Sequence, residues 1–283
     1  MSNLKLRVLL IFTVLPLLFS LVFLLPYFNY LAISIVAAAF SISGTYETWK
    51  LFYGKYSKTD FAFVTLIAYS IPLLVYLESA SIIPFNTVYY FAGIIIFMIF
   101  TYQIFSRDEN LYSEINKKTS SMLILMFYPG LFFSYTIRFT TLHYPSYALL
   151  VFMLVVFIND ICAYITGMLW GSSSRKVIPI SPKKSLIGFI GGFTSSILST
   201  TIFYFIFPPF FSNNYFYSLV TGALIGIVSI VGDLNESAMK RSARLKDSGD
   251  VLPGRGGILD NIDSLIFSAP VFYYIIRYIS FQG

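Results

Sequence analysis

The sequence has almost none of the side chains from which disulfides, zinc sites and histidine-dependent active sites are built. It contains one cysteine, Cys162, and one histidine, His143, in 283 residues. A single cysteine excludes an intramolecular disulfide, and one Cys with one His cannot hold a structural zinc ion. We expect His143 to lie far from the acidic cluster described below, which also speaks against a nucleophile activated by histidine.

Charged residues are scarce too, at 11% of the chain, whereas 57% of the residues are hydrophobic and 19% are aromatic. Soluble globular proteins have about a quarter charged residues, so this composition predicts an integral membrane protein. A bilayer core about 30 Å thick needs about 20 helical residues. We therefore expect an all-α, polytopic membrane protein with about nine transmembrane helices, at residues 8–25, 28–43, 61–78, 87–105, 120–138, 146–168, 187–207, 216–233 and 264–281.

Nothing in the sequence divides the chain into separate domains, because it has no internal repeat and no low-complexity linker. We expect a single membrane domain over residues 1–283. Residues 1–138 would supply the first five helices, and residues 139–283 would supply helices six to nine with the catalytic motifs. Lys5 and Arg7 precede the first run as in a signal peptide, but no small-residue cleavage site follows, so we expect this run to be a retained helix.

Basic residues are distributed unequally between the two ends of these helices. Seventeen of the 19 Lys and Arg residues fall at the N-terminus or after helices two, four, six and eight, and only Arg138 and Arg277 fall near the other ends. Basic segments stay in the cytoplasm, so we expect a multi-pass protein of the cell inner (plasma) membrane with a cytoplasmic N-terminus and an external C-terminus. The net charge of +6 then indicates attraction to anionic lipids, and no nucleic-acid partner is expected.

Two acidic residues of the N-terminal half lie close to predicted helix ends. Glu47, beside Trp49, is expected to be an interfacial carboxylate, and Glu78 is expected to reach the opposite interface. No chemistry is assigned to the first five helices.

The densest group of charged residues lies between Gly232 and Asp263. It begins where the eighth apolar run leaves the bilayer as a helix. One face of this helix is expected to carry a carboxylate, a hydroxyl and three cations, at offsets of 0, 4, 7, 8 and 11. These residues are Asp233, Ser237, Lys240, Arg241 and Arg244.

A loop with Lys246 and Asp247 leads to a glycine-rich turn, residues 253–257, and then to Asp260 and Asp263. Glycines let backbone N–H groups approach an anion. Carboxylates facing cations across such a turn suit a metal-assisted phosphoryl site, because Mg²⁺ takes oxygen ligands and cations hold phosphate oxygens. Two simpler interpretations stay open: the aspartates could cap a helix, and the cations could mark a cytoplasmic loop.

An acidic residue, Asp160, falls well inside the sixth apolar run, where a buried charge costs several kcal/mol unless it is paired or hydrated. Asp160, Tyr164 and Gly167 share one helical face, which could line a cavity. The alternative is an aspartate bonded to Tyr or Asn that serves only helix packing.

The segment before the seventh apolar run contains Pro182, Lys183, Lys184 and Ser185. Ser185 can cap the following helix, which leaves two cations at a helix N-terminus, a suitable place for a triphosphate. By charge alone, a plain cytoplasmic loop would look the same. Gly191 and Gly192 are expected to let this helix pack closely on a neighbour.

Three ordered blocks between Asp160 and Asp263 resemble the motifs of the phosphatidate cytidylyltransferases, also called CDP-diacylglycerol synthases. They are Asp160-x-x-Ala163-Tyr164-x-x-Gly167-x-x-Trp170-Gly171, then Pro182-x-Lys184-Ser185-x-x-Gly188, then Ser237-x-x-Lys240-Arg241 with Lys246-Asp247-Ser248-Gly249 and Leu252-Pro253-Gly254-x-Gly256-Gly257-Ile258-x-Asp260-x-x-Asp263. Two positions depart: the family usually has His where this chain has Arg255, and Arg where it has Asn261.

The resemblance implies that CTP and phosphatidate react to give CDP-diacylglycerol and diphosphate, with Mg²⁺ as the cofactor. It leaves open a second cation and a homodimer. Phosphatidate would come from the cytoplasmic leaflet. The catalytic set is Asp233, Asp260, Asp263 and Lys240; the metal set is Asp233, Asp260, Asp263 and Asp160; and the substrate-binding set is Lys183, Lys184, Ser185, Ser237, Arg241, Lys246, Asp247, Arg255, Gly256 and Gly257.

Two other classes of protein remain as alternatives. A related CTP-dependent transferase or kinase acting on another lipid phosphate or alcohol would use similar residues. A secondary transporter could also contain Asp160 and basic loops, but its substrate site would be expected near the membrane midplane. Here the predicted polar cluster lies at one interface.

Overall fold

The structure is a computed structural model that describes residues 16–53, 58–104, 115–172, 174–175, 178–182, 184–249 and 256–282. These residues form helices joined by turns and contain no β-strand. Residues 16–24 are helical and precede α2. The remaining elements are α2 (Tyr27–Tyr53), α3 (Lys58–Ser79), α4 (Thr87–Ile104), α5 (Ile115–Leu125), η2 (Met126–Phe132), α6 (Phe133–Arg138), η3 (Phe139–Thr141), α7 (Pro145–Trp170), α8 (Leu186–Ile206), η4 (Pro208–Phe211), α9 (Tyr215–Ser242) and α10 (Leu259–Ser280).

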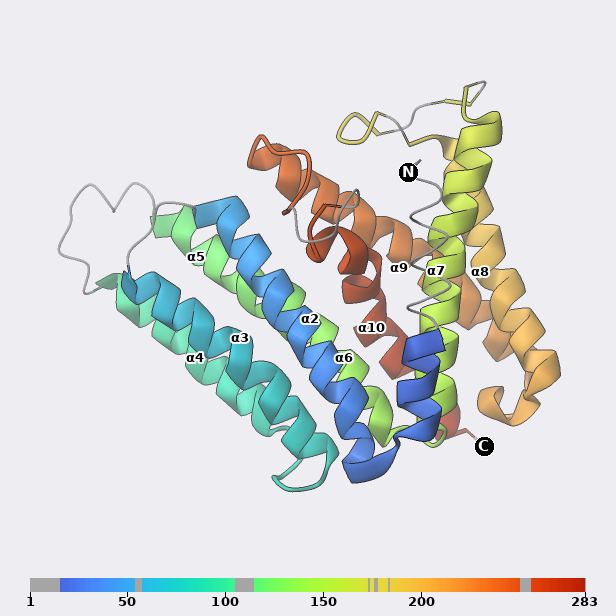
Figure 1. The fold of residues 1–283 in the computed structure, drawn as a ribbon, viewed down its shortest axis with the longest axis horizontal. Helices are drawn as coiled ribbons and strands as arrows, with labels where there is room; N and C mark the ends of the chain where they lie inside the picture. The colour runs from blue at the N-terminus through green and yellow to red at the C-terminus, as the bar shows by residue number, and fades with distance from the viewer. Residues whose placement is uncertain are drawn as a thin grey trace.

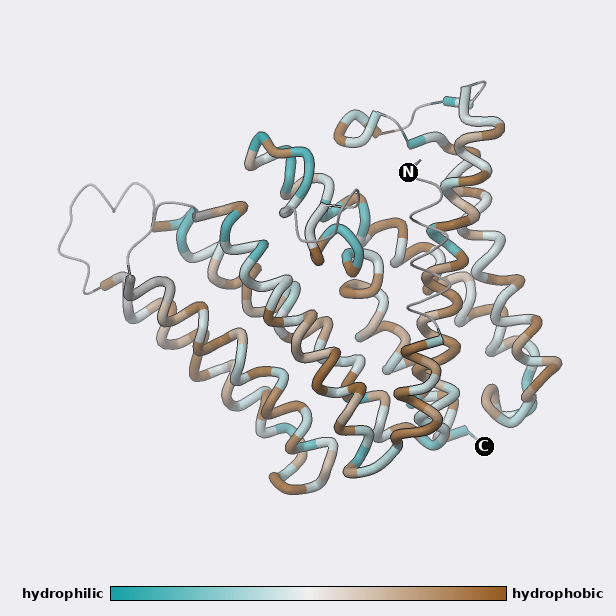
Figure 2. The backbone as a smooth tube through the Cα atoms, viewed as in Figure 1, coloured by the Kyte–Doolittle hydropathy of each residue, from teal (hydrophilic) through white to brown (hydrophobic). Residues whose placement is uncertain are grey.

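The helices confirm the predicted membrane fold. Within the described chain, seven helical stretches are long and apolar enough to cross a bilayer, and α4 contains a shorter apolar helix. With residues 16–24, these stretches coincide with the nine predicted runs, although nine remains an approximate count. Hydrophobic residues predominate along the helix bodies, and hydrophilic residues gather at the upper ends of α2, α9 and α10 (Figure 2).

Helix ends differ from the predicted ends where charged residues follow an apolar run. The α9 helix continues to Ser242, which confirms the predicted extension out of the apolar run. Arg244 lies beyond it with a positive φ of 58°, so its predicted place on the same helical face is wrong. The α2 helix runs past the predicted end to Tyr53, and α10 begins at Leu259, so Glu47, Asp260 and Asp263 all belong to helices.

One of the predicted helices contains a π-helical segment. Elements α5, η2 and α6 follow one another without a break, and Pro129 lies inside η2. Proline lacks an N–H and disturbs the regular hydrogen-bond ladder, which is a common cause of such irregularities. Ser41 of α2 donates to the Pro129 carbonyl at 2.7 Å, so a neighbouring helix satisfies an acceptor in this segment.

The C-terminal half is a packed series in which α7 contacts α8, α8 contacts α9 and α9 contacts α10 (Figure 1). Small residues allow the close approach. A Cβ atom on Gly192 would lie 3.0 Å from the Asn159 side chain of α7. Asn159 is buried and donates to Ser196 of α8 at 2.8 Å. The close packing predicted at Gly191 and Gly192 is therefore confirmed.

A buried ion pair lies at the other end of the bundle from the glycine-rich turn. Glu78 and Arg138 are 4% and 1% exposed and form an ion pair, and Glu78 also accepts the Val88 N–H. The Arg138 guanidinium lies 5.0 Å from the ring centroids of Phe85 and Tyr89. Glu78, next to the last residue of α3, is thus buried against an arginine, and its position at the membrane interface stays a prediction.

Candidate active site

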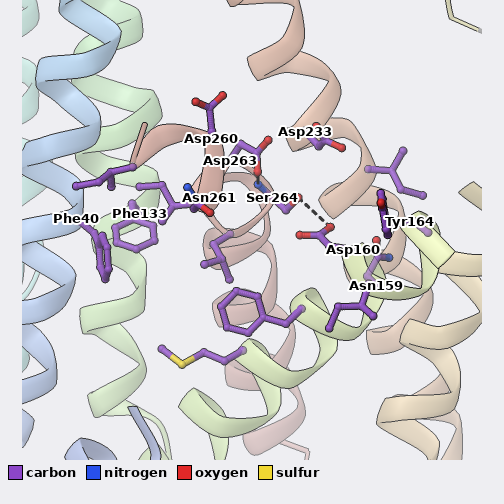
Figure 3. A pocket seen from close by; sticks show the side chains of 18 of the residues that line it. Phe40, Phe133, Asn159, Asp160, Tyr164, Asp233, Asp260, Asn261, Asp263 and Ser264 are labelled. Carbon is purple, nitrogen blue, oxygen red and sulfur yellow. Dashed lines mark hydrogen bonds between the residues drawn. The ribbon is translucent and has the colours of Figure 1, made fainter. Parts of the chain in front are cut away.

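Four aspartates from three helices line one cavity (Figure 3). Asp160 comes from α7, Asp233 from α9, and Asp260 and Asp263 from α10. The volume of the cavity is about 1300 Å³. Asp160 and Asp263 are 103 positions apart in the sequence, and the packing of α7, α9 and α10 brings all four aspartates to one cavity.

The cavity has a charged end and an apolar wall. Asp160, Tyr164 and Gly167 all line it, which confirms the cavity-lining face predicted on this helix. Lys184, Ser185, Lys246, Asp247 and Gly256 belong to its charged end. The apolar wall comes from α2, α6 and α7: Ile33, Val36, Ala37, Phe40, Phe133, Ile137, Phe152, Met153 and Phe157.

Asp263 and Asp160 are connected through Ser264. The Asp263 carboxylate is 7% exposed and accepts the Ser264 N–H at 2.6 Å. The Ser264 hydroxyl donates to Asp160 Oδ1 at 3.2 Å, the bond drawn as a dashed line in Figure 3. Because this contact joins α7 to α10, it fixes the separation of two carboxylates at the cavity wall.

Asp233 forms an ion pair with Lys184, which lies in the connection between α7 and α8. Both side chains are partly exposed, at 38% and 24%, so the pair lies at the accessible part of the cavity. Ser185 follows Lys184 and caps α8 by accepting the Gly188 N–H at 3.3 Å, which confirms its predicted role as a cap. The cap places Lys184 at the N-terminus of α8.

Lys240 lies between two carboxylates. Its Nζ is 2.5 Å from a carboxylate oxygen of Glu236 and 2.5 Å from Oδ1 of Asp260. Glu236 is fully buried, and the Lys240 side chain is 14% exposed. A buried carboxylate needs a cation beside it, so Lys240 neutralises charge inside the site and joins α9 to α10.

Asp260 also organises the glycine-rich turn. Its Oδ2 accepts the N–H of Ser248 at 2.9 Å and the N–H of Gly257 at 2.7 Å, and it lies 3.0 Å from the Ser248 hydroxyl. Gly256 has a φ of +82°, a conformation that favours glycine. Asn261, one of the two departures from the resembled motif, donates to the Gly257 carbonyl at 2.7 Å. Gly257 is thus held by side chains at both of these α10 positions.

Sequence reasoning missed two buried acids of the site, Glu47 and Glu236. Glu47 is 5% exposed and accepts hydrogen bonds from the segment that begins α10, partners that the sequence did not indicate; its interfacial position stays a prediction. A signal existed for Glu236, because Glu236 and Lys240 have the i, i+4 spacing of a helical ion pair. No comparable signal existed for Glu47, whose partners lie more than 200 residues away.

The other predicted residues differ in their placement. Ser237 is half-buried on α9, and Arg241 is exposed and donates to the Leu245 carbonyl at 3.3 Å; neither lines the cavity. Lys183 and Arg255 lie outside the described residues.

The donor set fits a Mg²⁺ ion that is also bound by substrate. Among the described residues, no three acidic, His or Cys side chains are grouped closely enough to hold an ion by themselves. Mg²⁺ is commonly bound by one or two carboxylates together with phosphate oxygens and water. The carboxylates of Asp233, Asp263 and Asp160 offer such hard oxygen ligands at the cavity wall.

Residues 5–279 match the sequence profile of the cytidylyltransferase family, so the chain belongs to this family. Over 152 residues it is 38% identical to a phosphatidate cytidylyltransferase of Aquifex aeolicus, covering 53% of this chain and 54% of the relative. It is 38% identical over 176 residues to a phosphatidate cytidylyltransferase of Staphylococcus haemolyticus, covering 62% and 64%. It is 48% identical over 123 residues to the uncharacterized protein YnbB of Escherichia coli, covering 42% and 39%. The chain therefore spans between 39% and 64% of the length of these relatives.

Proposed function

We propose that this protein transfers the cytidylyl group of CTP to phosphatidate, giving CDP-diacylglycerol and diphosphate. The observation that carries the proposal is a single cavity with carboxylates and Lys184 at one end and a hydrocarbon wall at the other. An amphipathic substrate fits such a lining, because its phosphate can lie among charged groups while an acyl chain contacts apolar side chains. Membership of the cytidylyltransferase family supports CTP as the other substrate.

The reaction needs little acid–base chemistry from the protein. A phosphate oxygen of phosphatidate is already anionic at neutral pH and attacks the α-phosphorus of CTP. The bond from this phosphorus to the bridging oxygen breaks, and diphosphate leaves with the electron pair. Catalysis then rests on positioning the two substrates and on compensating negative charge.

The described residues can supply both requirements. Lys184, at the capped N-terminus of α8, is positioned to contact triphosphate oxygens together with backbone N–H groups. Asp260, held by Lys240 and by the turn, fixes the loop that carries Gly256 and Gly257. Mg²⁺, when bound by one or two of the carboxylates of Asp233, Asp263 and Asp160 together with phosphate oxygens and water, would neutralise phosphate charge and favour departure of diphosphate.

We also propose that the cavity opens toward the cytoplasm from the inner (plasma) membrane. The charged residues of the cavity come from α7, α9, the segment before α8 and the start of α10. The C-terminal ends of α7 and α9 and the start of α10 lie toward the upper side of Figure 1. Described basic residues such as Lys50, Arg175 and Lys246 belong to the same end. Basic segments are retained in the cytoplasm, where CTP is available.

The test is to incubate the detergent-solubilised protein with CTP labelled at either the α- or the γ-phosphorus, with Mg²⁺ and a panel of lipid acceptors. We expect the α-label to enter the lipid with phosphatidate and the γ-label to appear in diphosphate.

Each other outcome identifies a different class of protein. A γ-label in the lipid would show a CTP-dependent kinase, and transfer of the α-label only to another lipid phosphate would show a related transferase. No consumption of CTP by folded protein would contradict the enzyme and leave a transporter as the alternative.

A further inference from the structure

A carboxylate from the N-terminal half of the chain contacts the described residues on either side of the connection between α9 and α10. Glu47 belongs to α2, and its side chain accepts three hydrogen bonds from residues far away in sequence. Its Oε1 accepts the Ile258 N–H at 2.8 Å. Its Oε2 accepts the Leu259 N–H at 2.7 Å and the Ser248 hydroxyl at 2.8 Å.

These contacts place Glu47 at the N-terminus of α10. The first N–H groups of a helix have no partner within the helix, and the helix dipole favours negative charge there. Ile258, at the cap position, offers no side-chain acceptor. Glu47 of α2 therefore supplies from another helix the cap that the local sequence lacks.

Glu47 of α2 and Asp260 of α10 both accept hydrogen bonds from Ser248. Ser248 donates its N–H to Asp260 at 2.9 Å, and its hydroxyl lies 2.8 Å from Glu47 and 3.0 Å from Asp260. A hydroxyl has one proton to donate, so the two carboxylates share this donor. Lys240 then connects Asp260 to Glu236, and the chain of contacts runs from α2 through the turn to α9 and α10.

Two glycines on either side of the α9–α10 connection, Gly249 and Gly257, leave the space that the Glu47 carboxylate occupies. A Cβ atom on Gly249 would lie 3.0 Å from Glu47 Oε1. A Cβ atom on Gly257 would collide with Glu47 Oε2 and with the Ser248 hydroxyl. The glycines at these positions and the buried carboxylate are therefore parts of one arrangement.

We propose that Glu47 is a positioning residue for cytidylyl transfer. It fixes the start of α10 and Ser248, and through them the orientation of Asp260. The inference rests on the proposed function. Glu47 does not line the cavity. It acts through the turn, so its loss should lower kcat and kcat/KM for CTP more than it changes KM for the lipid.

The direct test is hydrogen exchange of the amides at residues 256–260 in Glu47→Gln, Glu47→Asp and Glu47→Ala, in detergent without substrate. Glutamine keeps one acceptor oxygen, whereas aspartate is too short to reach the turn and alanine offers no acceptor. We expect exchange of these amides to become about 10- to 100-fold faster in Glu47→Ala and Glu47→Asp, and less so in Glu47→Gln, given the strength of hydrogen bonds to charged groups.

Ser41→Ala is the matched control. Ser41 also lies buried on α2 and donates to another element, at the Pro129 carbonyl, away from the turn. This variant should leave exchange at residues 256–260 and the kinetic constants unchanged. Unchanged exchange at these amides in Glu47→Ala would overturn the proposal.

Kinetics separate a positioning role from a merely structural one. Per folded molecule, kcat should fall about 10²-fold in Glu47→Ala, in line with the cost of a misplaced catalytic group, with partial recovery in Glu47→Gln. A normal kcat with a lower yield of folded protein would overturn the positioning role. A parent protein that transfers no cytidylyl group would remove the proposed function, while accelerated exchange in Glu47→Ala would still establish the contact with the turn.

Discussion

Asp233 and Lys184 form an ion pair at the accessible part of the cavity, so replacing either changes the charge seen by a bound triphosphate. We predict that Asp233→Asn inserts and folds but loses about 10²- to 10³-fold in kcat, as expected when a well-placed electrostatic contact is removed. The measurement is α-label transfer to phosphatidate, with size-exclusion chromatography as the control for folding. Near-normal turnover would contradict a role for Asp233 in the reaction.

Lys184 should affect substrate binding more than the chemical step. Lys184 directly precedes the N-cap of α8, where phosphate oxygens would also meet backbone N–H groups, and its ammonium pairs with Asp233. We predict that Lys184→Ala raises KM for CTP about tenfold or more, as expected when a hydrogen bond to a charged group is lost, with a smaller change in kcat. An unchanged KM for CTP would mean that Lys184 contributes only to the orientation of the protein in the membrane.

Asp260 raises the question of whether a carboxylate holds the turn, binds metal, or does both. Its Oδ2 accepts two backbone N–H groups, and asparagine would place either one oxygen or an NH₂ group there. We predict that Asp260→Asn lowers kcat by about 10²-fold or more and raises the Mg²⁺ concentration needed for half-maximal rate. A lower rate with an unchanged Mg²⁺ requirement would assign Asp260 to the turn alone.

The connection between α9 and α10 depends on glycines that admit neighbouring carboxylates. We predict that Gly257→Ala lowers kcat about 10²-fold, because a Cβ atom there displaces Glu47 or Ser248 from the turn. Gly93→Ala is the matched control. Gly93 lies in α4. A Cβ atom there would meet no side chain or other segment within 4 Å, so Gly93→Ala should leave activity unchanged. Equal effects of the two substitutions would contradict the tight fit at Gly257.

Helices were predictable from the sequence where apolar runs are long, and less so where charged residues extend them. Hydropathy starts the last predicted run at Ser264, but α10 begins five residues earlier, at Leu259, where Glu47 caps its N-terminus. The π-helical segment around Pro129 was not predictable, since proline alone does not specify how neighbouring carbonyls are satisfied.

The aspartates of the site could be predicted because an acid inside an apolar run and a dense charged motif are both unusual. Their mutual arrangement could not, since it depends on the packing of α7, α9 and α10. Glu47 shows the limit most clearly. Its position near the end of a predicted helix indicated a residue at the membrane interface. Its partners in the structure include Ser248 and Ile258, which lie 201 and 211 residues later in the sequence.

For the whole bundle, the proposed orientation predicts that the two ends of the helices face different compartments. In a Cys162→Ser background, cysteine at Leu245 should react with an impermeant thiol reagent only from the cytoplasmic side, and cysteine at Gln282 only from the outside. Both positions are exposed. Reaction of both from one side would contradict the orientation and the cytoplasmic site.

The buried pair of Glu78 and Arg138 bears on how such a chain enters the membrane. Arg138 and Arg277 are the two exceptions to the charge asymmetry. Arg138 is neutralised by Glu78, and Arg277 donates to Tyr273 at 3.0 Å and lies 5.1 Å from the Phe85 ring centroid. Because both arginines lie within helices, neither adds a loop charge to the translocated side. In the proposed orientation, the basic loops on the cytoplasmic side therefore meet no opposing loop arginine. Glu78 on α3 is synthesised before the Arg138 that pairs with it.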